Sequence, residues 1–204
     1  MTPPRLYLAS RSPRRRELLS RLGVPFEPLP VEVDEHPRPD ERPEDYVLRL
    51  STDKARVGRQ TLPPGDPSWV LGSDTCVVLD GAILGKPRDR EHGLELLERL
   101  SGRVHEVLTA VALVDETRTL TTLVRSRVAL RPTTALERQA YWASGEPADK
   151  AGGYAIQGLG AALVTHLDGD WTAVMGLPLA ATHALLRQAG LPTALELPPT
   201  SPAG

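Results

Sequence analysis

The chain has 204 residues, of which 40% are apolar and 25% are charged, and its formal net charge is −2. A chain of this length and composition can bury a core without disulfides or a structural metal. The near-neutral charge argues against stable nucleic-acid binding, which usually leaves a basic surface. The single cysteine, Cys76, excludes a disulfide framework and a cysteine-based zinc site. We find no signal peptide and no apolar run of membrane-spanning length, so we expect a cytoplasmic protein without a membrane partner.

Strands and helices alternate along the chain, and the breaks between them are rich in proline and glycine. In chain order we predict a strand over 5–10, a helix that starts at Ser12-Pro13, an edge strand over 26–35, a helix over 43–57, a hairpin over 69–87 around Asp80-Gly81, a helix over 90–102, a hairpin of strands 105–115 and 118–130, a helix from a capping box at Thr134 and Glu137 to about Ser144, a hairpin over 161–176 and a helix over 179–190. Repeated hairpins exclude a purely parallel sheet. The fold class is therefore α/β, with a mixed twisted sheet and flanking helices in one domain over 1–194, and a disordered tail over 195–204.

Four arginines surround the start of the first predicted helix, at Arg11, Arg14, Arg15 and Arg16. Their charge opposes the helix dipole, which favours acidic residues in a first turn. A helix start that follows a strand binds anions through its free N–H groups, and guanidinium groups match phosphate oxygens. We predict that Arg14 and Arg15 bind phosphate. A solvated basic face is the alternative, and it is our interpretation of Arg11 and Arg16.

Polar residues interrupt the apolar strand of the first hairpin at Ser73-Asp74-Thr75. A buried carboxylate is costly unless it is paired or binds a metal, so Asp74 is a candidate to ligate Mg²⁺ or to accept a proton from water. The alternative is an edge strand with Asp74 in solvent. Lys86 follows one hairpin turn later, and antiparallel pairing would bring it near Asp74. A surface lysine is the simpler interpretation.

A glycine-rich segment over 145–160 carries Asp149, Lys150 and Gln157. Such a segment permits close approach to a ligand, but it is also typical of a flexible connector. Several carboxylates, including Glu35, end the second predicted strand, and Lys54 lies on the following helix. None of these residues is unusual individually. The five histidines show no metal-site spacing. Cations and scattered carboxylates, without a Ser-His-Asp set or an activated cysteine, together indicate phosphate chemistry assisted by a divalent metal.

Several motifs occur together in one order: LASRSPRRRELL, an acidic VDE, RLSTDKA, GSDTCVVLDGAILGKPRD, LSGRVHEVLTAV and EPADKAGGYAIQGLG. Over about residues 5–190 this set resembles the Maf family of nucleoside triphosphate pyrophosphatases. Within that family, SPRR, GSDT and DKAGGYAIQG look like the branch that acts on dTTP and UTP.

The resemblance implies metal-dependent hydrolysis between the α and β phosphates, which releases a nucleoside monophosphate and pyrophosphate. It implies two lobes around a central cleft, a fold related to the inosine triphosphate pyrophosphatases, Mg²⁺ or Mn²⁺ as cofactor, and a homodimer. Asp74 matches the family's proton acceptor. The positions that handle substrate, phosphate and metal match Ser10, Arg14, Arg15, Glu35, Lys54 and Lys86, and those linked to pyrimidine specificity match Arg14, Thr75 and Gln157. We expect Glu35 and Asp74 to hold the metal, and either of them could be the base.

Two other functions stay open at this point. One is a non-enzymatic regulator of cell division, because family members have been discussed in connection with septum formation. The other is the same chemistry on a different substrate, such as 7-methyl-GTP or a modified pyrimidine triphosphate. The motifs favour thymine and uracil but do not rank dTTP, UTP and CTP.

Overall fold

The computed structural model describes residues 4–196. Its elements are β1 (Leu6–Leu8), α1 (Pro13–Ser20), β2 (Phe26–Pro28), α2 (Pro43–Gln60), β3 (Trp69–Leu79), β4 (Ala82–Leu84), α3 (Arg90–Leu100), β5 (Val104–Val114), β6 (Thr119–Leu130), α4 (Ala135–Ala143), the 3₁₀ helices η1 (Glu146–Asp149), η2 (Ala151–Gly153) and η3 (Gly158–Leu163), β7 (Val164–Asp168), α5 (Trp171–Met175) and α6 (Leu179–Gln188). None of the helices in this part of the chain is long and apolar enough to cross a membrane. Except for residues 195–196, the predicted disordered tail lies outside the described residues.

Seven strands form one mixed sheet in the order β2-β1-β3-β5-β6-β7, and β4 pairs with β3 outside this path. The β1 strand runs parallel to both β2 and β3, whereas the pairs β3–β5, β5–β6 and β6–β7 are antiparallel. The first hairpin turns at Asp80 and Gly81, whose φ angles of 52° and 78° suit a tight two-residue turn. These features confirm the predicted mixed sheet, and β5 lies inside it between β3 and β6.

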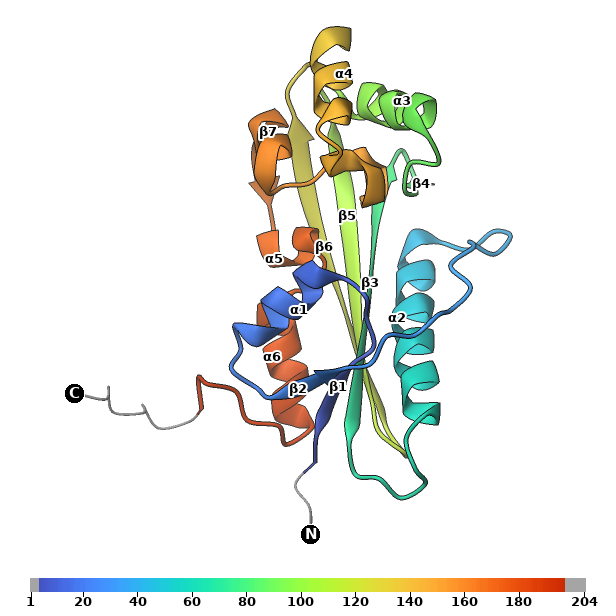
Figure 1. The fold of residues 1–204 in the computed structure, drawn as a ribbon, viewed down its shortest axis with the longest axis vertical. Helices are drawn as coiled ribbons and strands as arrows, with labels where there is room; N and C mark the ends of the chain where they lie inside the picture. The colour runs from blue at the N-terminus through green and yellow to red at the C-terminus, as the bar shows by residue number, and fades with distance from the viewer. Residues whose placement is uncertain (1–3, 197–204) are drawn as a thin grey trace, which may run out of the picture.

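Helices cover the sheet on both faces (Figure 1). The α2 helix packs against β3 and β5 on one face, and α1, α5 and α6 lie on the other. Side chains alternate along β3, so Val70 and Cys76 belong to clusters that include residues of α2, whereas Leu71 packs with α1 and α6. A separate core lies at the far end of the long strands, beneath α3 and α4.

Two predicted elements are wrong in type or extent. The expected edge strand over 26–35 ends at Pro28, because the prolines at 28 and 30 have no N–H to donate to a sheet ladder. The segment that carries Glu35 is therefore a loop. The expected hairpin over 161–176 is instead the end of η3, then β7 and the short helix α5. Asp170 caps α5 by accepting from the N–H groups of Thr172 and Ala173, and left-handed Gly176 ends it.

One edge of β3 is open at its centre. The β1 strand pairs with this edge only up to Leu71, and β4 begins to pair at Val77. Among residues 4–196, no strand covers the edge between these two points. On the other edge β5 pairs continuously from Val70 to Val78. The Ser73-Asp74-Thr75 segment therefore lies on a rigid strand that faces an opening in the sheet.

Candidate active site

A cavity of about 1190 Å³ lies at this opening. Its walls come from the β1–α1 turn, the loop before α2, the middle of β3, the β4 end and the glycine-rich segment. The lining includes all nine candidates from the sequence: Ser10, Arg14, Arg15, Glu35, Lys54, Asp74, Thr75, Lys86 and Gln157. Their placement in one cavity agrees with the candidate set, and their individual roles remain predictions.

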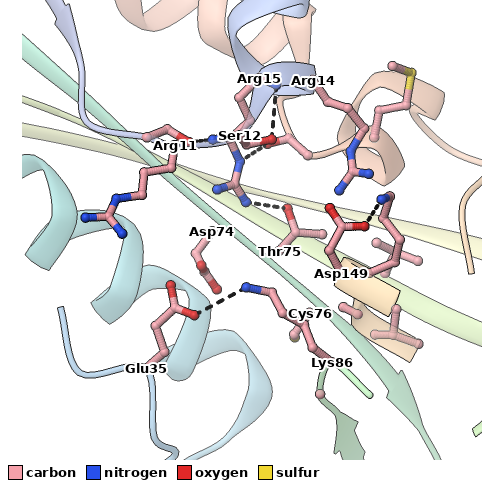
Figure 2. A pocket seen from close by; sticks show the side chains of 18 of the residues that line it. Arg11, Ser12, Arg14, Arg15, Glu35, Asp74, Thr75, Cys76, Lys86 and Asp149 are labelled. Atoms are coloured by element: carbon pink, nitrogen blue, oxygen red, sulfur yellow. Dashed lines mark hydrogen bonds and ion pairs between the residues drawn. The ribbon is translucent and has the colours of Figure 1, made fainter. Parts of the chain in front are cut away.

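The arginine turn follows β1 directly and is stabilised by two serines. Ser12 is the N-cap of α1, where its hydroxyl accepts from the Arg15 N–H at 3.4 Å, and the buried Ser10 hydroxyl accepts from the Ser12 N–H at 3.1 Å. Arg14 and Arg15 extend toward the cavity (Figure 2). No acidic residue occupies the first turn of α1. The helix dipole and the arginines therefore act together at one wall, which favours an anionic ligand.

The neighbouring arginines differ from this pair and from each other. Arg16 is exposed and does not line the cavity, as expected for a solvated residue. Arg11 does line the cavity, at its rim, and pairs with Glu32 at 2.6 Å. Both side chains of that pair are exposed, so the ion pair adds little stability.

Asp74 and Glu35 share one lysine. The Lys54 ammonium lies 2.6 Å from Asp74 Oδ1 and 2.6 Å from Glu35 Oε1, and Lys86 approaches the second Glu35 oxygen at 3.7 Å. Figure 2 shows Lys86 extended toward Glu35 beside Asp74. The Asp74 side chain is 9% exposed and that of Glu35 is 45% exposed. Asp74 is thus a buried, paired carboxylate on a central strand, and the alternative of an edge residue in solvent is wrong.

Close packing of α2 on β3 brings Lys54 to Asp74. A Cβ atom at Gly72 would lie 2.1 Å from the carbonyl oxygen of Ser51 and 2.7 Å from the backbone nitrogen of Ala55. Only glycine permits this approach of helix and strand backbones. Gly72 stands two residues before Asp74, so both positions face α2. Glycine has no side chain to separate helix and strand there, and the Asp74 carboxylate therefore lies close to α2. The position of the ion pair follows from this contact.

Burial and charge shift the pKa values of the groups around the cavity. Burial lowers the pKa of the Arg15 guanidinium, and the charges of Asp74 and Glu35 oppose this effect. Burial likewise lowers the pKa of Arg14, which Asp149 partly offsets. Burial alone would raise the pKa of Glu35, but the hydrogen bond and charge of Lys54 lower it below its usual range. A bound polyanion would stabilise the charges of these partly desolvated arginines.

Cys76 also lines the cavity, and its side chain is buried. Burial, reinforced by the negative charge of Asp74, raises the pKa of its thiol to about 12. At neutral pH the group is therefore a neutral thiol. The thiolate is the reactive form of cysteine, and this pKa keeps it from forming. This agrees with the prediction that the chain has no activated cysteine.

The glycine-rich segment is an ordered wall rather than a flexible connector. The Glu146 carboxylate accepts hydrogen bonds from Tyr141 Oη at 2.7 Å and from the N–H groups of Leu159 and Gly160 at 2.9 Å each. Tyr141 Oη in turn accepts from the Ala155 N–H at 3.0 Å. These bonds fix both ends of the 155–160 stretch. The stretch carries the exposed Gln157 to the cavity.

The same wall contains a buried histidine–tyrosine pair. His105 Nε2 lies 2.7 Å from the hydroxyl of Tyr154, which lines the cavity, and the two rings meet edge to face. His105 Nδ1 is buried and has no hydrogen-bond partner among the described residues. Burial lowers the pKa of His105 to about 4. The folded protein therefore holds this imidazole neutral.

This neutral histidine predicts acid sensitivity. The unfolded chain takes up the proton near pH 6.5, whereas folded His105 does so only near pH 4, so stability falls as the pH drops through this window. Between pH 7 and pH 5 we expect the free energy of unfolding to decrease by about 2 kcal/mol from this residue alone. Urea unfolding at both pH values measures it. His105→Gln, which retains a hydrogen-bonding side chain but does not titrate, should show a flatter profile, and an equally steep profile in that variant would contradict the assignment.

Two residues of the cavity were mentioned in the sequence pattern but not chosen as candidates. Asp149 and Lys150 pair with each other, and the charge of Asp149 offsets part of the lowering that burial causes in the pKa of Arg14. Figure 2 shows Asp149 directed toward the same space as Arg14. The sequence signal that could have identified Asp149 and Lys150 as cavity residues is their position in the glycine-rich segment. Among residues 4–196, no group of three or more His, Cys, Asp or Glu side chains is arranged to hold a metal ion by itself.

Comparison with known proteins gives matches over nearly the whole chain. The family described as Maf-like protein matches residues 5–189. A dTTP/UTP pyrophosphatase of Methylococcus capsulatus is 55% identical over 198 residues, which are 97% of each chain. Another, of Alkalilimnicola ehrlichii, is 54% identical over 186 residues, which are 90% of this chain and 92% of the relative. Among solved structures, a nucleoside-triphosphatase (dITP/XTP pyrophosphatase) of Mycobacterium abscessus matches with 21% identity and a TM-score of 0.39, covering 62% of this chain and 72% of the other.

Proposed function

The chain belongs to the Maf-like protein family, and from this premise we propose that it hydrolyses dTTP and UTP to the nucleoside monophosphate and pyrophosphate. The names of the relatives from Methylococcus capsulatus and Alkalilimnicola ehrlichii, which align with most of the chain, support this substrate choice. The observation that carries the proposal is a buried carboxylate, Asp74, in the same cavity as Arg14 and Arg15 at a helix start. Hydrolysis of a phosphoanhydride needs both a group that accepts a proton from water and cations for the phosphates.

Asp74 accepts the proton of the attacking water in this proposal. It is the less exposed of the two carboxylates, and the Lys54 ammonium fixes one of its oxygens. The second oxygen remains for the water. Glu35, which is half-exposed and forms ion pairs with Lys54 at 2.6 Å and Lys86 at 3.7 Å, positions these lysines and faces the phosphates in this proposal. Water then attacks the α phosphorus, and the bond to the bridging oxygen of the β phosphate breaks.

The cations hold the triphosphate and stabilise charge on the leaving pyrophosphate. Arg14 and Arg15 offer guanidinium groups at one wall, and Lys86 offers an ammonium at the other. Such fixed positive charges lower the barrier to phosphoryl transfer because negative charge builds on the leaving group. Gln157 lines the cavity on the glycine-rich wall, and in this proposal it contacts the nucleobase.

A divalent metal is also part of the proposal. Mg²⁺ is typically held by one or two carboxylates together with substrate phosphates and water, so the carboxylates of Glu35 and Asp74 fit this role once a triphosphate supplies further oxygens. The bound metal would neutralise phosphate charge. The Lys54 ammonium lies 2.6 Å from one oxygen of each carboxylate, so each keeps a second oxygen for this role.

A panel of nucleotides tests the proposed function. The purified protein is incubated with Mg²⁺ or Mn²⁺ and with dTTP, UTP, CTP, 5-modified uridine triphosphates, 7-methyl-GTP and purine triphosphates, and pyrophosphate and monophosphate are both measured. We expect one pyrophosphate per monophosphate, the highest kcat/KM for dTTP and UTP, and loss of activity with EDTA that either metal restores.

Each part of the proposal has its own contradicting result. Release of inorganic phosphate without pyrophosphate would contradict the cleavage position. A preference for 7-methyl-GTP would contradict the substrate choice, and full activity in EDTA would contradict the metal. No turnover of any triphosphate would favour a nucleotide-binding regulator.

A further inference from the structure

A line of hydroxyl groups leads from the cavity into the core. Arg15 Nη2 lies 3.3 Å from Thr75 Oγ1, Thr75 Oγ1 lies 2.9 Å from Thr109 Oγ1, and Thr109 Oγ1 lies 2.7 Å from the carbonyl oxygen of Ala173. Thr75 and Thr109 face each other across β3 and β5 as direct partners in the ladder. Thr109 is fully buried and does not line the cavity.

The direction of every hydrogen bond in this line is determined by its two ends. A carbonyl oxygen only accepts, so the one hydroxyl hydrogen of Thr109 points to Ala173. The Thr109 oxygen can then only accept from Thr75, whose single hydroxyl hydrogen is used in that bond. A guanidinium only donates, so the Thr75 oxygen accepts from Arg15. The hydroxyl of Thr75 therefore has no hydrogen left for a ligand.

A second contact ties the same guanidinium to the same helix. Arg15 Nε donates to the carbonyl oxygen of Gly176 at 2.9 Å, and Gly176 is the residue that ends α5. Ser73 Oγ lies 2.9 Å from this oxygen and 3.0 Å from the carbonyl oxygen of Ala110, and its one hydrogen can be donated to either. Of the five N–H hydrogens of a guanidinium, these two contacts of Arg15 use two and leave three for a ligand. The short helix α5 thus sets the orientation of Arg15 through both its Ala173 and Gly176 carbonyls.

We propose that Thr109 is a positioning residue for Arg15, and that Thr75 acts on the nucleotide through Arg15 rather than by donating a hydrogen bond to the base. Thr109 does this by accepting the Thr75 hydrogen, which turns the Thr75 oxygen toward the guanidinium. The effect on the nucleotide rests on the proposed function. The orientation of Arg15 does not.

Thr109→Val and Thr109→Ser test the proposal. Valine retains the shape of threonine but removes the hydroxyl, and serine retains the hydroxyl. For dTTP we expect kcat/KM to fall about tenfold in Thr109→Val, mainly through KM, which is the loss of about one hydrogen bond to a charged group. Thr109→Ser should stay within about twofold of the unchanged protein. Thr75→Val combined with Thr109→Val should lose no more than Thr75→Val alone, because both changes break one line of bonds.

The matched control is Thr182→Val on α6. Thr182 is also fully buried, and its hydroxyl has no partner among the described residues. Its replacement should leave kcat/KM unchanged. An unchanged kcat/KM in Thr109→Val, an equal loss in Thr109→Ser, or independent losses in the double variant would each overturn the proposal.

A measurement without substrate separates this proposal from the proposed function. Rotation about the Arg15 Cζ–Nη2 bond can be followed by NMR of the nitrogen-15-labelled guanidinium. We expect slow rotation in the unchanged protein and in Thr109→Ser, and rotation about tenfold faster in Thr109→Val. Equal rotation rates in all three proteins would overturn the positioning role, whether or not any triphosphate is hydrolysed.

Discussion

Asp74→Asn is expected to reduce pyrophosphate release from dTTP by a factor of about 10² to 10⁴ while the fold is retained. The activity falls because an amide cannot accept the proton of the attacking water. The fold is retained because Lys54 still has Glu35 at 2.6 Å as a counterion after Asp74 loses its charge. Turnover of dTTP and thermal unfolding of the same preparation measure the two effects.

Asp80→Asn is the matched control for this change. Asp80 lies in the turn directly after β3, is exposed, pairs with Arg103 and does not line the cavity. Its replacement should leave turnover within about twofold, since surface ion pairs contribute little. Near-normal turnover in Asp74→Asn would remove Asp74 from the role of base, and Glu35 would become the candidate.

Lys54→Met is expected to lower both stability and activity. Removal of the ammonium leaves the 9% exposed Asp74 carboxylate without its counterion, and an uncompensated buried charge costs about 3 kcal/mol of unfolding free energy. Activity should fall about a hundredfold, because Asp74 loses the ammonium that fixes one of its oxygens. Urea unfolding and dTTP turnover measure these changes.

Two double variants identify the carboxylate that causes the loss of stability. Lys54→Met with Asp74→Asn should recover most of the lost unfolding free energy, because the buried charge is removed along with its partner. Lys54→Met with Glu35→Gln should recover little, because Glu35 is 45% exposed and still has Lys86 nearby. Equal recovery in the two double variants would contradict the view that Asp74 is the desolvated group.

Local signals in the sequence predict most of the fold. Asp80-Gly81 and the Thr134–Glu137 capping box act over a few residues, and the structure contains both features as predicted. The hairpin expected over 161–176 is wrong because α5 has only five residues, too few for a helical period to appear. Its two ends are defined by Asp170 and Gly176, which also read as turn residues. Hydrophobic periodicity therefore does not detect a helix this short, although its capping residues can be recognised in the sequence.

The sequence motifs predict which residues line the cavity, but most of the contacts between these residues could not be predicted. A polar residue in an apolar strand is compatible with an exposed edge or with a buried site. The sequence does not show that β1 and β4 leave the middle of β3 uncovered, and this gap is what places Asp74 at a cavity. Glu35 reaches Lys54 from a loop that was expected to be a strand. Arg15 is held by Gly176, which is 161 positions away in the chain. Such contacts depend on the packing of distant elements and leave no local pattern.

Hydrolysis of dTTP in oxygen-18-labelled water tests the central claim most directly. Water activated by Asp74 attacks the α phosphorus in this account, so a single turnover should place the heavy oxygen in the nucleoside monophosphate and none of it in pyrophosphate. Mass spectrometry of the two products distinguishes these outcomes. Heavy oxygen in pyrophosphate would mean attack at the β phosphorus and would contradict the proposed role of the cavity.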